Sequence, residues 1–109
     1  MLDKAKAREI AYNYSLEVVK ALNPDKVIFF GSYVNGTPHS DSDIDVAVFI
    51  DGLDNDTWYE ARIILQRLRW NRDFLYIEPH LLEEANDKSG FAAHVLKTGE
   101  VIYAAPIAV

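Results

Sequence analysis

Helical and extended hydrophobic patterns alternate along this chain. Apolar residues recur at helical spacing from about Leu2 to Leu22, and Asn23-Pro24 then ends the helix. Residues 27–30 form a short, continuous apolar run that stops at Gly31, a pattern typical of a buried strand. The first third of the chain therefore predicts a helix followed by a buried strand.

A second strand is predicted after the polar stretch 37–42. Side chains alternate between the two faces of a strand. The residues expected on one, buried face are Ile44, Val46, Val48 and Ile50, and those expected on the other are Asp43, Asp45, Ala47 and Phe49. Asp43 and Asp45 are thus expected to be neighbours on one face, with Cα atoms about 6.6 Å apart.

The later elements follow from caps and apolar runs. Thr57 and Glu60 resemble a capping box, which predicts a helix from Thr57 to about Trp70. The further predictions are a strand opened by Asp73 (73–77), a short helix over 81–85, a helix capped by Ser89 that ends near Thr98, and a strand over 101–103. The order α-β-α-β-α-β-α-β predicts a single α/β domain of the α+β type over residues 1–109. Its mixed sheet has about four strands, with helices mainly on one face.

Composition and charge narrow the class of protein. The chain has 109 residues, half of them hydrophobic, and no cysteine, so we expect one folded domain without disulfides or thiolate metal sites. It shows neither a membrane-length apolar run nor a signal-peptide core, which favours a cytoplasmic protein. The net charge of −6 disfavours binding to a nucleic-acid template.

Gly31-Ser32 and the two aspartates are the candidate chemical groups. A strand that enters a helical turn directs free backbone N–H groups at a ligand, and glycine permits close approach of the phosphate, while the Ser32 hydroxyl adds a donor. Two carboxylates about 5 Å apart repel by roughly 3 kcal/mol at an effective dielectric of about 20, so a cation would stabilise the pair. Hard oxygen ligands favour Mg²⁺ or Mn²⁺.

With these residues the chain resembles a minimal nucleotidyltransferase of the DNA polymerase beta-like superfamily. The matching positions are Gly31-Ser32, Gly36, Ser42-Asp43-Ile44-Asp45 and the tail Val46-Ala47-Val48. The resemblance implies ATP as the nucleotide, bound through Gly31, Ser32 and Asp43. It further implies one or two metal ions held by Asp43 and Asp45. A third acidic residue on a later strand, for which Asp73 is the candidate, would complete the second metal site or take the proton of the attacking hydroxyl. An acceptor hydroxyl would attack the α-phosphorus and release pyrophosphate. Minimal members often carry a small residue and then Arg before the glycine matched to Gly36, where this chain has Val34 and Asn35.

The resemblance also implies a partner. Stand-alone minimal nucleotidyltransferases are often encoded beside a small helical protein of the HEPN type, act as its antitoxin and transfer AMP to one of its tyrosines. We take this as the leading hypothesis, with Trp58, Trp70, Tyr33 and Tyr59 as aromatic residues that could form a partner surface or belong to the ordinary core and rim. A nucleotidyltransferase for a small molecule such as an aminoglycoside, a non-catalytic partner-binding module on the same fold, and a homo-oligomer all stay open.

Overall fold

Helices and strands alternate along the chain as predicted, in a computed structural model that describes residues 2–38 and 42–106. The elements are α1 (Lys4–Leu22), β1 (Lys26–Phe30), α2 (Ser32–Asn35), β2 (Ile44–Phe49), α3 (Asn55–Leu68), a 3₁₀ turn η1 (Arg72–Phe74), β3 (Ile77–Leu82), α4 (Phe91–Thr98) and β4 (Glu100–Ala104). Residues 39–41, in the predicted polar loop, lie outside the described part.

The four strands form one mixed sheet in the order β3-β2-β1-β4. β1 pairs antiparallel with both β2 and β4, and β2 pairs parallel with β3. A parallel pair needs a long crossover connection, and α3 supplies it between β2 and β3. The predicted mixed, four-stranded sheet is confirmed.

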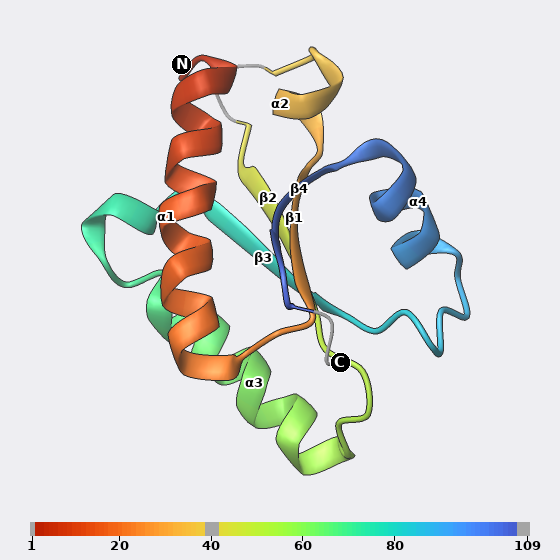
Figure 1. Cartoon of the computed structure of the whole chain (residues 1–109). Coiled ribbons are helices and arrows are strands. Elements are labelled where there is room, and N and C mark those ends of the chain that lie inside the picture. Colours follow the sequence, from red (N-terminus) through yellow and green to blue (C-terminus); the bar gives the residue numbers. More distant parts are fainter. Residues whose placement is uncertain (1, 39–41, 107–109) are drawn as a thin grey trace.

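Each face of the sheet has its own core. On one face, the β2 residues Ile44, Val46 and Val48 pack with buried residues of α1 and with Leu65 of α3. On the other, Ala47 and Phe49 pack with Ala92 and Val95 of α4. Figure 1 shows α1 and α3 on one side of the sheet and α4 on the other. The predicted alternation along β2 is therefore confirmed, and Asp45 lies on the α4 face.

Helix α1 is joined to α3 through a buried tyrosine. Tyr14 is fully buried, and its hydroxyl donates a hydrogen bond of 2.7 Å to the carbonyl of Leu65. Its ring also meets the ring of Phe74 edge-on, with centroids 5.4 Å apart. At 19 residues α1 is the longest helix, and none in the described ranges is both long and apolar enough to cross a membrane.

The start of α3 differs from the prediction. The helix begins at Asn55, and Asp54 is its N-cap, with the carboxylate accepting a 2.8 Å hydrogen bond from the Thr57 N–H. The predicted Thr57 cap is therefore wrong, because an aspartate three residues earlier caps the helix and Thr57 lies inside its first turn. The helix ends at Leu68 rather than Trp70.

The predictions around β3 were also wrong. Residues 73–77 are not a strand: η1 contains Asp73, and β3 begins only at Ile77. Residues 81–85 are not a helix, because Leu81 and Leu82 continue β3 and pair with Val48 and Phe49 of β2. Pairing with a buried strand outweighed the local preference.

The last helix begins two residues after its predicted cap. Gly90 is the N-cap of α4, while the Ser89 hydroxyl accepts a 3.3 Å hydrogen bond from the Phe91 N–H. The Asp87 carboxylate accepts bonds from the next two N–H groups, of Ala92 and Ala93. Two side chains therefore share the capping role predicted for Ser89.

Candidate functional site

Gly31 makes the turn between β1 and α2. Its φ and ψ angles of 91° and −156° belong to a region that side-chain-bearing residues rarely adopt. Its carbonyl accepts hydrogen bonds from the N–H groups of Val34 and Asn35, which closes the short helix. The N–H groups of Ser32 and Tyr33, at the start of this helix, have no carbonyl partner within it.

Asp45 lies directly against this turn. It is the antiparallel partner of Phe30, the residue before Gly31. A Cβ atom added to Gly31 would lie 2.2 Å from Oδ2 of Asp45, which is far too close for any side chain. Glycine is therefore required here, both for the backbone angle and for the carboxylate that lies beside it.

Asp43 precedes β2 by one residue and is exposed, whereas Asp45 is half-buried. Strand alternation gives the two residues the same orientation if the extended backbone continues back to position 43. The structure thus places Gly31 and Asp45 together, with Asp43 two residues before Asp45 in the chain.

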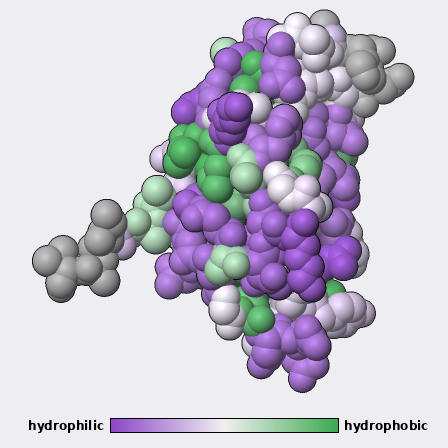
Figure 2. All heavy atoms as spheres, turned by 90° about the vertical axis from the view of Figure 1, so that its right-hand side faces the viewer, coloured by the Kyte–Doolittle hydropathy of each residue, from purple (hydrophilic) through white to green (hydrophobic). Residues whose placement is uncertain are grey.

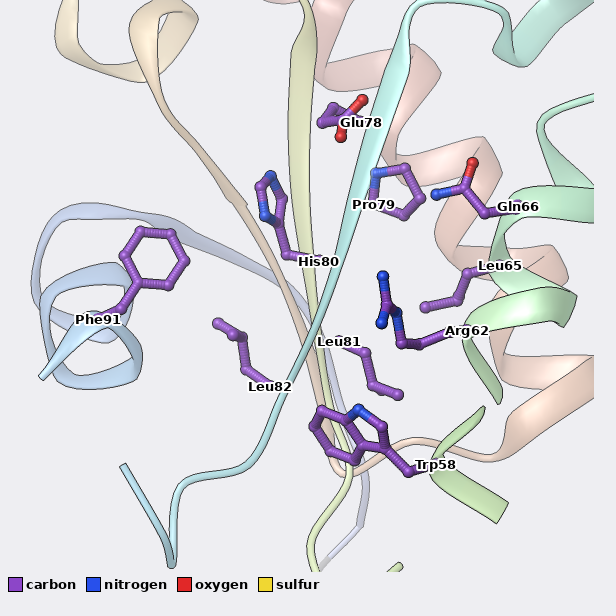
Figure 3. A pocket seen from close by; sticks show the side chains of 10 residues that line it. All are labelled: Trp58, Arg62, Leu65, Gln66, Glu78, Pro79, His80, Leu81, Leu82 and Phe91. Carbon is purple, nitrogen blue, oxygen red and sulfur yellow. The ribbon is translucent and has the colours of Figure 1, made fainter. Parts of the chain in front are cut away.

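β3 adds two polar side chains to this face. In the parallel register Asp45 pairs with Glu78, and Ala47 pairs with His80. Residues paired across neighbouring strands project to the same face, and such strands lie about 4.8 Å apart. His80 Nε2 is 3.2 Å from Oδ1 of Asp45, and an ionised carboxylate can only accept this hydrogen bond. Figure 3 shows His80 on the side of β3 toward Phe91 of α4, and Pro79 on the side toward Gln66 of α3.

Glu78 is the acidic residue that pairs with Asp45 in the sheet, and the sequence analysis did not include it in the site. The prediction took Asp73 as the third acidic residue of the site. Asp73 is exposed in η1, and its N–H donates a 2.9 Å hydrogen bond to Asn71. It lines a hollow of about 870 Å³ together with residues of α1, such as Glu9 and Asn13. Since α1 packs on the sheet face opposite to Asp45, the structure brings Glu78, and not Asp73, to the neighbourhood of Asp45.

Asp43, Asp45 and Glu78 provide only hard carboxylate oxygens, which suit Mg²⁺ or Mn²⁺. Oδ2 of Asp45 occupies the space that a side chain at position 31 would fill, so this carboxylate lies close to the backbone of the turn. In this conformation, no three His, Cys, Asp or Glu side chains of the described residues converge closely enough to enclose an ion. One oxygen of Asp45 is within hydrogen-bond distance of His80 Nε2, so binding of a cation by these carboxylates would require their side chains to turn toward it.

An aromatic wall borders the carboxylates on the α4 side. The His80 ring lies 5.1 Å from that of Phe30 and 6.0 Å from that of Phe91, between centroids. Phe30 is buried, whereas Phe91 is 38% exposed at the rim. A hollow of about 440 Å³ along β3 is lined by Glu78, His80 and Phe91, and by Trp58 and Arg62 from α3. This volume is in the range of small-molecule sites, roughly 300–1,000 Å³.

Comparisons with known proteins agree with this fold. The family described as "Polymerase beta, Nucleotidyltransferase" matches residues 13–106. No curated protein sequence matches the chain. Among solved structures, the chain is similar to a candidate nucleotidyltransferase from Sulfolobus solfataricus, at 18% identity and a TM-score of 0.67, over 93% of this chain and 83% of that one.

Two further similarities are to toxin–antitoxin structures. A chain of a toxin–antitoxin structure with AMP-PNP is 26% identical, with a TM-score of 0.58, over 86% of this chain and 73% of that one. A chain of the MntA–HepT toxin–antitoxin structure is 20% identical, with a TM-score of 0.54, over 89% and 73% of the two chains. The similarities at 18% and 20% identity show a shared fold.

Proposed function

The chain belongs to the polymerase beta nucleotidyltransferase family, and we propose that it transfers AMP from ATP to a hydroxyl group of a partner protein. The acceptor proposed is a tyrosine of a small HEPN-type protein, for which this chain would be the antitoxin. The observation that carries the proposal is the carboxylate of Asp45, which lies against the backbone of Gly31 at the end of a buried strand.

The residues of the turn would bind the triphosphate. The free N–H groups that follow Gly31 and the hydroxyl of Ser32 are donors suited to phosphate oxygens. Asp43 and Asp45 would hold Mg²⁺ or Mn²⁺. Glu78 would complete the set in place of Asp73, and its pairing with Asp45 across β2 and β3 supports this choice. When bound, the metal neutralises charge on the phosphates and orients the oxygens that exchange.

The transfer itself is a substitution at the α-phosphorus. The acceptor oxygen bonds to this atom while the bond to the bridging oxygen breaks, and pyrophosphate leaves with the electron pair. The hydroxyl proton passes to a carboxylate, for which Glu78 on the edge strand β3 is our candidate. Most of the rate enhancement would come from positioning and charge stabilisation.

The identity of the nucleotide and of the partner rests on similar proteins. The structure with AMP-PNP contains an ATP analogue, and it is a toxin–antitoxin structure. The MntA–HepT structure is also a toxin–antitoxin structure, and one of its chains has the same fold. These similarities support ATP as the nucleotide and a protein as the partner, and the HEPN type comes from the family resemblance.

The test is transfer of label from ATP labelled at the α-phosphate. We expect the purified chain, with Mg²⁺ and a HEPN-type protein encoded beside it, to label that protein covalently. Asp43→Asn and Asp45→Asn should each abolish labelling, and chelation of the metal should do the same. The matched control is Asp51→Asn, an exposed aspartate at the opposite end of β2. Labelling that survives both site variants would refute the proposal.

The same experiment separates the two alternatives. Label found on a low-mass acceptor without any protein partner would indicate a small-molecule transferase, and the acidic net charge of −6 would suit a cationic acceptor. Tight binding to the partner that is unchanged when Asp43 and Asp45 are both replaced, with no labelling, would indicate a non-catalytic binding module. The presence of Asn35 where an arginine is common keeps this last outcome relevant.

A further inference from the structure

The outer face of α3 carries exposed aromatic and apolar side chains. Trp70 is 82% exposed, Tyr59 65% and Ile63 38%. They recur at intervals of four and seven residues, so they follow one side of the helix and the turn after it. They line a hollow of about 320 Å³ together with Arg62, Gln66 and Arg67. We call these six residues the α3 surface.

This patch contrasts with the face on the α4 side. Figure 2 shows that face, where hydrophilic residues predominate and hydrophobic ones form small, separate areas. Of the aromatic residues considered from sequence, Tyr33 is buried and Trp58 is half-buried, so both belong to the interior or its rim. Tyr59 and Trp70 are exposed, so they are available for contact with another molecule.

Positive charge is concentrated at the same place. Four of the five arginines lie within residues 57–72 (Arg62, Arg67, Arg69 and Arg72), and Glu60 is the one acidic residue of this stretch. The stretch is therefore +3, with Asp56 and Asp73 directly beyond its two ends, and the rest of the chain carries −9 to give the net −6.

The hollow contains two arginines, Arg62 and Arg67. The neighbouring Arg69 is half-buried and donates hydrogen bonds to Gln66 and to the Leu75 carbonyl. Arg62 and Arg67, by contrast, form no ion pair with any acidic side chain in ranges 2–38 and 42–106. Their charge is available to a molecule that docks on the hollow.

We propose that the α3 surface docks an acidic amphipathic helix of a partner protein. Trp, Tyr and Arg are the residues most enriched at the energetic centres of protein interfaces. The hollow beside Ile63 suits an apolar side chain, and Arg62 and Arg67 beside it suit flanking carboxylates. The charge of −9 on the rest of the molecule opposes a nucleic acid as the occupant. The docking helix is inferred to belong to the acceptor protein of the proposed transfer, and this step rests on that function.

The test uses fluorescein-labelled synthetic peptides and needs no nucleotide. The probe is an 18-residue peptide with leucine at every third or fourth position and glutamate elsewhere. A scrambled peptide of the same composition, a version with lysine in place of glutamate, and a single-stranded RNA oligonucleotide are the comparison probes. We expect the acidic amphipathic peptide to bind most tightly, by fluorescence anisotropy.

Variants locate the binding. Trp70→Ala and Arg67→Glu should each weaken binding of the acidic amphipathic peptide by roughly tenfold or more. Tyr12→Ala, which removes a 44% exposed aromatic side chain from α1, should leave it unchanged. Because all three positions are exposed, the variants should keep the thermal melting transition of the parent.

Four results would overturn the proposal: equal binding of the scrambled peptide, preferred binding of the RNA, no binding of any probe, or binding that survives both variants. A dimer in size-exclusion chromatography that Trp70→Ala converts to a monomer would also overturn it, because the occupant would then be a second copy of the chain. Loss of labelling in the Asp43→Asn and Asp45→Asn variants bears on the transfer reaction alone, so the two proposals can fail separately.

Discussion

At the scale of single residues, the contact between Gly31 and Asp45 gives the sharpest prediction. Gly31→Ala puts a Cβ where Oδ2 of Asp45 now lies, 2.2 Å away, in a backbone conformation that alanine adopts poorly. We expect a loss of roughly 1–3 kcal/mol in the free energy of unfolding, measured by urea denaturation, and weaker binding of Mg²⁺-ATP.

Gly36→Ala is the matched control for this change. Gly36 also has a positive φ, of 79°, but nothing lies within 4 Å of an added Cβ. The substitution should cost about 1 kcal/mol in the same denaturation experiment and leave nucleotide binding near that of the parent chain. Equal loss of nucleotide binding in both variants would show that the contact with Asp45 is not what matters.

Glu78 and Asp73 can be compared directly. If Glu78 completes the site, Glu78→Gln should lower the rate of AMP transfer by about 10²-fold or more, since a carboxylate that takes the proton is lost. Asp73→Asn should change the rate only a few-fold, because its N–H bond to Asn71 lies in η1 beside α1. Single-turnover labelling measures both, and the reverse ranking would assign the third position to Asp73.

The candidate site was partly predictable for a local reason. Gly31, Ser32, Asp43 and Asp45 lie within fifteen residues of one another, next to or at the ends of two apolar strands, and alternation along the second strand predicts the direction of Asp45. Glu78 could not be found in the same way. Its direction depends on where β3 begins and on its pairing with β2, and a strand taken to begin at Asp73 gives no basis for grouping Glu78 with Asp45.

At the scale of elements, the strands with an unbroken apolar pattern were predicted well and β3 was not. The run at 27–30 and the alternation at 44–50 match β1 and β2 closely. β3 has a proline at its centre and polar residues on either side of it, so its own sequence favours a strand weakly. Its position is set by tertiary pairing with β2, which local patterns do not contain.

The link between α1 and α3 gives the next prediction. Tyr14→Phe keeps the ring against Phe74 but removes the hydroxyl that donates to the Leu65 carbonyl. The carbonyl is then left without this partner, and we expect a loss of about 1–2 kcal/mol at pH 7. Thermal unfolding followed by circular dichroism measures it, and an unchanged melting temperature would contradict the role of this bond.

The same tyrosine predicts how stability depends on pH. Burial raises the pKa of the Tyr14 hydroxyl above its ordinary value of 10.0. The folded state therefore keeps Tyr14 neutral while the unfolded state ionises, and its contribution is full below pH 10 and is lost as pH rises toward the folded pKa. We expect the parent chain to lose more stability than Tyr14→Phe between pH 9 and pH 11, so that the gap between them narrows.

At the scale of the whole molecule, ion pairs of Glu100 connect β4 to the first helix, α1. Its carboxylate, at the start of β4, lies 2.7 Å from Lys4 Nζ and 3.3 Å from Arg8 Nε in α1. The hydrogen bond from Lys4, with a smaller contribution from Arg8, holds the pKa of Glu100 below its ordinary 4.5 despite partial burial. Stability from this group is therefore present above pH 4.5 and is lost as the pH falls through the lowered value.

Glu100→Gln tests this connection. Because the side chain is partly exposed, we expect a loss of only about 0.5 kcal/mol at pH 7 in low salt. The difference should fade below pH 4 and in 1 M NaCl, where screening weakens the ion pairs. Urea denaturation at pH 7 and below pH 4 measures the difference in the free energy of unfolding. The comparison is Glu17→Gln, because the Glu17 carboxylate pairs with Lys20 within α1.

The short α4 leaves the candidate site accessible to water. With eight residues it packs on Ala47 and Phe49, while Asp43 stays exposed and Asp45 only half-buried. A reactive phosphate held there would be open to hydrolysis, since an active site prevents this side reaction by closing over its substrate. We therefore expect the isolated chain to leak AMP slowly from ATP, and a docked acceptor to suppress the leak by serving as the missing lid.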